Sequence, residues 1–168
     1  MKKILFIDRL CNIRGSSAAV FDYAYYNQTI LGNTSVIAYD LNAPKDRNQE
    51  SYFEPQIVEN YQKHFDVITY SNTSDLEKVS SSYDLVYNIK SGAPEEPMVY
   101  GTKTANHVMF TVWMPHGDRY AFVSEWLSKY MTKGSGSWVP HIVDLPQPNP
   151  LARNAIRKQL GISENQYV

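Results

Sequence analysis

Short apolar runs alternate with segments of helical spacing along most of this chain. The runs are typical of buried strands, because several consecutive apolar residues can bury both faces of a strand. Between them, apolar residues recur at intervals of three and four, which predicts helices with one inward face. The predicted strands are 3–8, 35–39, 66–70, 84–88, 107–113, 121–124 and 138–139. The predicted helices start at Ser16 or Ser17 and run to Leu31, then cover 52–64, 75–82, 125–132 and 155–160.

This alternation predicts the fold class. Short strands separated by helices form a parallel sheet that is covered on both faces. We therefore expect an α/β protein with a doubly wound, Rossmann-like parallel sheet of six to seven strands and helices on both faces. Right-handed crossovers then bring the ligand-binding loops together at the carboxyl ends of the strands.

The domain organisation follows from a proline-rich segment near the end of the chain. Residues 140–150 contain four prolines and no helix signal, which is typical of a stiff, extended connector. Residues 151–168 then begin a new pattern: a basic helix, a glycine stop at Gly161, a polar turn, and an incipient strand at Tyr167. We expect one Rossmann-like domain over 1–150 and a stub of a second domain over 151–168.

Composition narrows the functional classes. A net charge of −1 argues against nucleic acid as the main partner, and the single Cys11 excludes an internal disulfide framework. No apolar run reaches the length of a membrane span, and the N-terminus has no signal-peptide pattern, so a cytoplasmic location is expected. No pair of histidines has metal-ligand spacing, and neither a metal nor another cofactor is expected.

The thirteen tyrosines suit either a sugar-binding cleft or a half-buried core.

Three loops carry the candidate chemistry. Gly15, Ser16 and Ser17 follow the first strand, where a glycine and free N–H groups at a helix start favour an anionic ligand group. The alternative is an ordinary helix cap. His116 and Asp118 lie in a tight turn after the fifth predicted strand, where the histidine could hold a hydroxyl or a phosphate, or accept a proton. The alternative is a histidine bonded to its own turn.

The third candidate loop contains Ser124 and Glu125, which follow the sixth predicted strand. Ser124 either contacts a ligand or only caps the next helix, and Glu125 favours a first helical turn through the helix dipole alone. Cys11 has no evident cationic neighbour, so the sequence does not favour a reactive thiol.

The order of these parts resembles that of the GT-B glycosyltransferases, and most closely their family-4-like, retaining group. The segments that carry the resemblance are YAFVSEWLS at 120–128, VPHIVD at 139–144, and 153–168 with RKQLGI at its centre. The resemblance covers nearly the whole chain in layout, and its motifs are concentrated after His107.

The resemblance implies the acceptor-binding half of an enzyme that transfers a sugar from a nucleotide-sugar donor to a glycan or other hydroxyl acceptor. It implies metal-independent transfer with retention, and no turnover by this domain alone. Gly15 would lie beside the donor phosphates, His116 would contact the donor sugar, and Asp118 would help to orient the acceptor. Two alternatives remain open: a stand-alone nucleotide- or partner-binding module without catalysis, and a two-domain epimerase of the same architecture.

Overall fold

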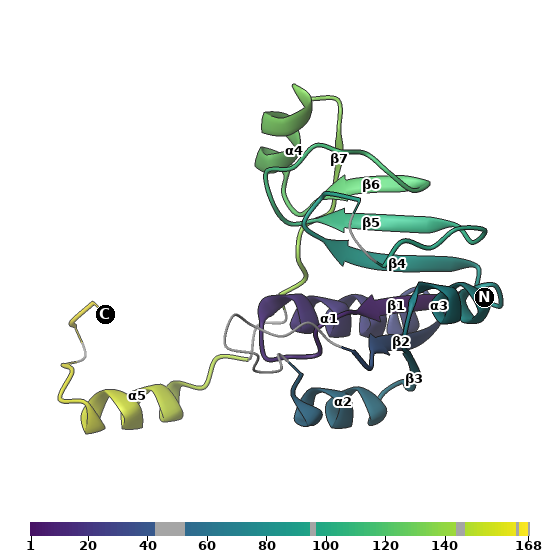
Figure 1. The fold of residues 1–168 in the computed structure, drawn as a ribbon. Helices are drawn as coiled ribbons and strands as arrows, with labels where there is room; N and C mark the ends of the chain where they lie inside the picture. Colours follow the sequence, from purple (N-terminus) through teal and green to yellow (C-terminus); the bar gives the residue numbers. More distant parts are fainter. Residues whose placement is uncertain (43–52, 95–96, 144–146, 164, 168) are drawn as a thin grey trace.

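A seven-stranded, all-parallel sheet forms the centre of the molecule (Figure 1). The computed structural model describes residues 1–42, 53–94, 97–143, 147–163 and 165–167. The strand order is β3-β2-β1-β4-β5-β6-β7, so the sheet is doubly wound, as the sequence predicts. The strands are β1 (Lys3–Asp8), β2 (Thr34–Asp40), β3 (Asp66–Tyr70), β4 (Leu85–Lys90), β5 (Thr104–Val108), β6 (Arg119–Phe122) and β7 (Ser137–Trp138).

Helices cover both faces of this sheet, because successive strand residues point to opposite sides. The helices are α1 (Gly15–Thr29), α2 (Pro55–Gln62), α3 (Thr73–Ser80), α4 (Glu125–Thr132) and α5 (Pro150–Gln159). Ile4 and Phe6 of β1 pack with α1 and α2, on what we call the α1 face. Leu5 and Ile7 point the other way and pack with Leu76 of α3, on the α3 face. A smaller cluster of Val108, Phe122 and Leu127 joins α4 to the same sheet.

In the part of the chain that the structure describes, the crossovers from β4 to β5 and from β5 to β6 are loops without a helix. Helices would normally fill these positions. The first loop keeps Val99 buried against the α3 face, and the second brings Trp113 against Phe122. Part of the α3 face is therefore covered only by loops.

The predicted fifth strand, 107–113, is wrong in its bounds. The strand that pairs with β4 is Thr104–Val108, and Val108 is its last residue. The apolar residues that follow, from Met109 on, leave the sheet, and Trp113 packs against Tyr120 and Phe122 of β6. The strand itself carries polar residues at Thr104 and Asn106, which hides it from a hydrophobicity pattern.

The segment after β7 crosses the α1 face as a strap, residues 139–142. His107 Nε2 donates to the carbonyl oxygen of Val139 at 2.8 Å, and the hydroxyl of Tyr87 therefore donates to Nδ1 at 2.7 Å. The hydroxyl of Tyr23 donates to the carbonyl oxygen of Pro140. His107 is thus buried in its neutral form, and burial lowers its pKa from 6.5 to about 4.

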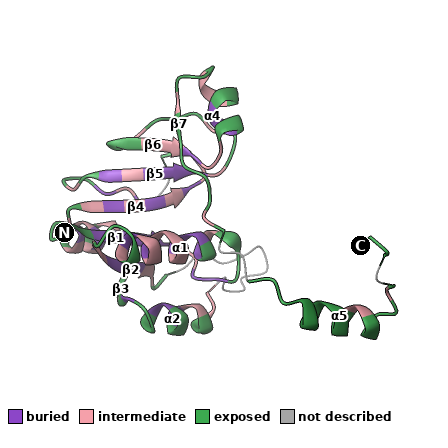
Figure 2. Cartoon of the chain, turned by 180° about the vertical axis from the view of Figure 1, so that it is seen from behind, coloured by how far each residue is buried: buried purple, intermediate pink, exposed green. Residues whose placement is uncertain are grey.

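Helix α5 is longer than the sequence pattern predicts, and it stands apart from the sheet (Figure 1). The helix starts at Pro150, because Asn149 caps it by accepting from the N–H of Ala152, and proline suits the first helical position. The predicted stop at Gly161 is confirmed: its φ is +67°, and the N–H of Ile162 bonds back to Arg157. Tyr167 is not in a strand. None of the α5 residues is buried, and Figure 2 shows the helix exposed along nearly its whole length.

Candidate functional site

A crevice lies at the carboxyl edge of the sheet, between β1 and β4. The chain leaves β1 towards β2 on one side, whereas β4 lies on the other side of β1, so the loops that follow these two strands diverge. They leave a cavity of about 260 Å³, which we call the switch crevice. Its lining includes Asp8, Arg9, Ser16, Lys90, Ser91 and Phe110. Parallel α/β sheets bind ligands at this position.

Asp8 organises the loop that forms one wall of the switch crevice. Its side chain is 3% exposed at the end of β1. One carboxylate oxygen accepts from the backbone N–H groups of Leu10 at 3.2 Å and Cys11 at 3.1 Å. The other oxygen accepts from the hydroxyl of Tyr61 at 2.6 Å, which ties the loop to α2. These bonds hold Cys11 at a φ of +43°, a conformation that few non-glycine residues adopt.

Cys11 is not an activated thiol. It is 1% exposed, and burial, followed by the neighbouring charge of Asp8, raises the pKa of its thiol. A nucleophilic cysteine needs the thiolate form, which an apolar site beside a carboxylate disfavours. The same causes raise the pKa of the Tyr61 hydroxyl, so both groups stay neutral.

The start of α1 forms the opposite wall. Arg14 occupies the N-cap position without a side-chain cap bond, and the first N–H groups of a helix have no acceptor within it. Ser16 lines the switch crevice, and a Cβ added to Gly15 would meet nothing within 4 Å. Ser17 is different: it is buried, and its hydroxyl accepts from the N–H of Asn12 at 3.1 Å. Gly15 and Ser16 can therefore face a ligand, whereas Ser17 fixes the loop.

Ser124 and Glu125 lie away from the switch crevice. Ser124 caps α4 by accepting from the N–H of Leu127 at 3.1 Å, and Glu125 pairs with Lys129 at 2.8 Å. The strand before them, β6, is three strand spacings from β1, which is about 14 Å. The structure shows the capping role that the sequence left open for Ser124.

The structure does not place His116 and Asp118 at the carboxyl edge, where the sequence analysis expected them. The chain turns back over the α3 face after β5, so both residues lie just before β6, towards the amino ends of the strands. The N–H of Thr104 donates to Asp118 at 2.9 Å, and the amide of Asn106 donates to the carbonyl oxygen of His116 at 2.8 Å. The two residues are brought together, but in a different cavity.

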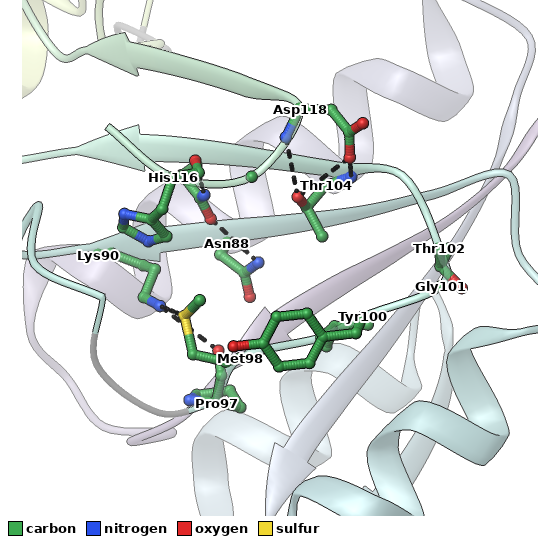
Figure 3. Close-up of a pocket in the computed structure, with 13 residues that line it drawn as sticks. Asn88, Lys90, Pro97, Met98, Tyr100, Gly101, Thr102, Thr104, His116 and Asp118 are labelled. Atoms are coloured by element: carbon green, nitrogen blue, oxygen red, sulfur yellow. Dashed lines mark hydrogen bonds between the residues drawn. The ribbon is translucent and has the colours of Figure 1, made fainter. Parts of the chain in front are cut away.

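This second cavity, the α3-face pocket, has a volume of about 280 Å³ (Figure 3). Asn88, Thr104 and Asn106 form its floor, and none of them is more than 5% exposed. Lys90 lines this pocket as well as the switch crevice, so the two cavities meet at one side chain. Asn88, Lys90 and Asn106 are not among the site residues that the sequence predicts. The available signal for Asn88 and Lys90 was an amide and an amine two positions apart in the otherwise apolar strand β4, whereas Asn106 lies in the mixed strand β5.

Three further observations bear on the class of protein. No helix among the described residues is long and apolar enough to cross a membrane. Within the described ranges, no three His, Cys, Asp or Glu side chains are grouped so that they could hold a metal ion. Fold and crevice together define a Rossmann-like, doubly wound α/β protein. Comparisons with protein-family models, with curated proteins and with solved structures found no match to this chain.

Proposed function

We propose that this chain is the acceptor-side domain of a metal-independent, retaining glycosyltransferase of the GT-B type, which takes its sugar from a nucleotide-sugar donor. The observation that carries the proposal is the switch crevice, with the first turn of α1 on one wall and Arg9 and Lys90 in its lining. The N–H groups of the first turn of α1, the dipole of this helix and the cationic Arg9 favour a diphosphate at this edge.

The chemistry of the intact enzyme needs a second surface. A GT-B active site lies between two facing domains, so one domain can hold a substrate without stabilising the transition state. Helix α5 stands apart from the sheet after a proline-rich segment, in keeping with a connection to a further domain. A retaining transfer needs no strong base from this domain, and none is assigned.

Turnover is the direct test. The complete gene product that contains residues 1–168 is incubated with UDP-, GDP- and ADP-sugars and a set of glycan acceptors. Release of nucleoside diphosphate together with a product of unchanged anomeric configuration is the expected result. Release without transfer to any acceptor, or a product that is an epimer of the donor sugar, would contradict it. A His116→Ala variant with unchanged turnover would remove His116 from the reaction.

Gly15→Ala separates ligand approach from folding. The added methyl group meets open space in the structure, and alanine is the better helix former, so the melting temperature should stay the same or rise. A phosphate that approaches the backbone at this point would lose that approach. We expect the affinity of residues 1–168 for a nucleoside diphosphate to fall about tenfold, measured by titration calorimetry.

Ser74→Thr is the matched control, because it also adds one methyl group to an exposed first-turn residue, here of α3. Its affinity for the nucleoside diphosphate should equal that of the unchanged chain. Equal affinity in Gly15→Ala would mean that the phosphate does not bind at the start of α1.

A stand-alone binding module is the second candidate, because both walls of the switch crevice come from residues 1–168 alone. The same calorimetry distinguishes the two functions. Tight nucleotide-sugar binding by these residues, about micromolar or better, favours the module. Weak binding favours the glycosyltransferase domain, in which the facing domain supplies most of the donor contacts.

A further inference from the structure

The α3-face pocket has the construction of a ligand site in its own right. We propose that it binds a monosaccharide-sized polyol, such as a pyranose, through the side chains of Asn88, His116 and Asp118 and the ring of Tyr100. The proposal goes beyond sugar transfer, and it stands whether or not the switch crevice takes a nucleotide. Four observations support it: a ring nitrogen of His116 without a partner, the hydrogen-bonded amides of Asn88 and Asn106, the Tyr100 ring at the edge of the cavity, and the cavity volume.

The unpaired nitrogen belongs to His116. Its Nδ1 lies 2.8 Å from the carbonyl oxygen of Met114, which can only accept, so Nδ1 carries the proton in the neutral ring. Nε2 is then an acceptor. This atom is buried, and among the described residues it has no hydrogen-bond partner. A buried acceptor without a donor is costly, and a ligand hydroxyl would remove that cost.

The amide chain orients further acceptors. Asn88 donates to the amide oxygen of Asn106 at 3.3 Å, and Asn106 donates to the carbonyl oxygen of His116 at 2.8 Å. The side-chain oxygen of Asn88 is the atom not used in this chain, and Figure 3 shows it turned into the pocket, towards Met98. Asp118 is an exposed residue in the lining of the pocket, and it accepts from Thr104 through one carboxylate oxygen, so the other oxygen is left for a ligand.

These acceptors select the chemical class of the ligand. A polyol supplies an O–H donor to each of the three: Nε2 of His116, the oxygen of Asn88 and the carboxylate of Asp118. A phosphate at neutral pH offers almost no donors and would meet the charge of Asp118. The Lys90 amine can balance part of the negative charge of a phosphate. However, it lies 3.4 Å from the carbonyl oxygen of Pro97 and 3.4 Å from the sulfur of Met98.

Tyr100 closes the mouth of the pocket. Its ring lies beside Met98 at the edge of the cavity (Figure 3), and the residue is 67% exposed. A flat aromatic face with a polar tip can stack on the C–H surface of a sugar ring while its hydroxyl bonds to a ligand oxygen. The cavity volume of about 280 Å³ is close to the lower end of the range for small-molecule sites, which fits one sugar ring.

Gly117 makes the pocket possible. Its φ is +74°, and a Cβ there would lie 2.4 Å from the hydroxyl of Thr104 and 2.6 Å from the amide nitrogen of Asn106. The loop can therefore lie directly on β5 and bring His116 over the sheet. With loops in place of helices on this part of the α3 face, the floor stays open to a ligand.

The test is an NMR titration of residues 1–168 with glucose, mannose, galactose, N-acetylglucosamine and myo-inositol, each added separately. The resonances to follow are the ring nitrogens of His116 and the side-chain amides of Asn88 and Asn106. At least one of these polyols should shift all three sets saturably. Inorganic phosphate is titrated in parallel. No saturable shift with any polyol, or the same shifts with phosphate alone, would overturn the proposal.

Two variants and one control make the assignment specific. His116→Phe keeps a ring against Tyr120 but removes the acceptor, and Tyr100→Ala removes the exposed mouth; each should weaken the polyol about tenfold. Tyr130→Ala is the control, because Tyr130 is 66% exposed on α4, outside the pocket. Unchanged affinity in both pocket variants, with native amide spectra, would show that the polyol binds elsewhere.

Discussion

Asp8→Ala is expected to lower the free energy of unfolding by about 4 kcal/mol. The substitution removes the carboxylate acceptor of the buried Tyr61 hydroxyl, which is left with the carbonyl oxygen of Ser17 at 2.9 Å. The N–H groups of Leu10 and Cys11 lose their acceptor as well. Bonds to a carboxylate contribute about 1.5–3 kcal/mol, and an orphaned buried donor costs about 1–3 kcal/mol. Chemical denaturation with an unchanged m-value would measure the loss.

Asp66→Ala is the control for this prediction. Asp66 is also a terminal residue of a strand, but it is the first residue of β3 and is exposed. Its replacement should change the free energy of unfolding by no more than about 0.5 kcal/mol. A loss below 1 kcal/mol in Asp8→Ala would mean that the carboxylate does not hold the loop, and the geometry of the switch crevice would then need another explanation.

Lowering the pH from 7 to 4 should remove about 3 kcal/mol of stability through His107 alone. The folded chain holds this imidazole neutral, with a pKa of about 4, whereas the unfolded chain has the ordinary value of 6.5. Between these values the unfolded state binds more protons, so stability rises with pH and falls as the pH drops through this window. Desolvation is the main cause, and the neighbouring His141 adds to it. Denaturation curves at several pH values would give the slope.

His107→Gln should flatten this slope. Glutamine can still donate to Val139 and accept from Tyr87, but it does not titrate. His64→Gln is the control, because His64 is exposed in the turn just after α2. Both chains contain the same carboxylates, so the difference between their slopes of unfolding free energy against pH reports on His107 alone. A slope that stays the same in His107→Gln would show that His107 is not the group responsible.

Several elements could be predicted from the sequence because one local pattern determines each of them. β1 and β3 have the predicted bounds, since each is an apolar run that ends at a polar loop. α4 also has its predicted bounds, and Ser124 caps it as a serine before an acidic first turn should. The helix start at Gly15 and Ser16 could be predicted for the same reason, because a glycine and two serines follow a buried strand.

The position of His116 could not be predicted, because it depends on the path of a loop. The apolar residues after Val108 look like a continued strand, but they turn back over the α3 face. Hydrophobic periodicity predicts which side of a helix or strand is buried, but it does not predict the path of an irregular segment. Asn88 and Asn106 were missed because polar residues inside a strand lower its strand signal, although they form the floor of a pocket.

The loop crossovers of 91–103 and 109–118 also bear on how such a protein can diversify. Over the residues that the structure describes, neither crossover adds a helix to the core. Segments of this kind tolerate insertions and exchanges that a packed helix would not. The half of the molecule built from β1, β2 and β3 can thus stay constant as a scaffold while descendants of one ancestral gene acquire new specificities on the other half.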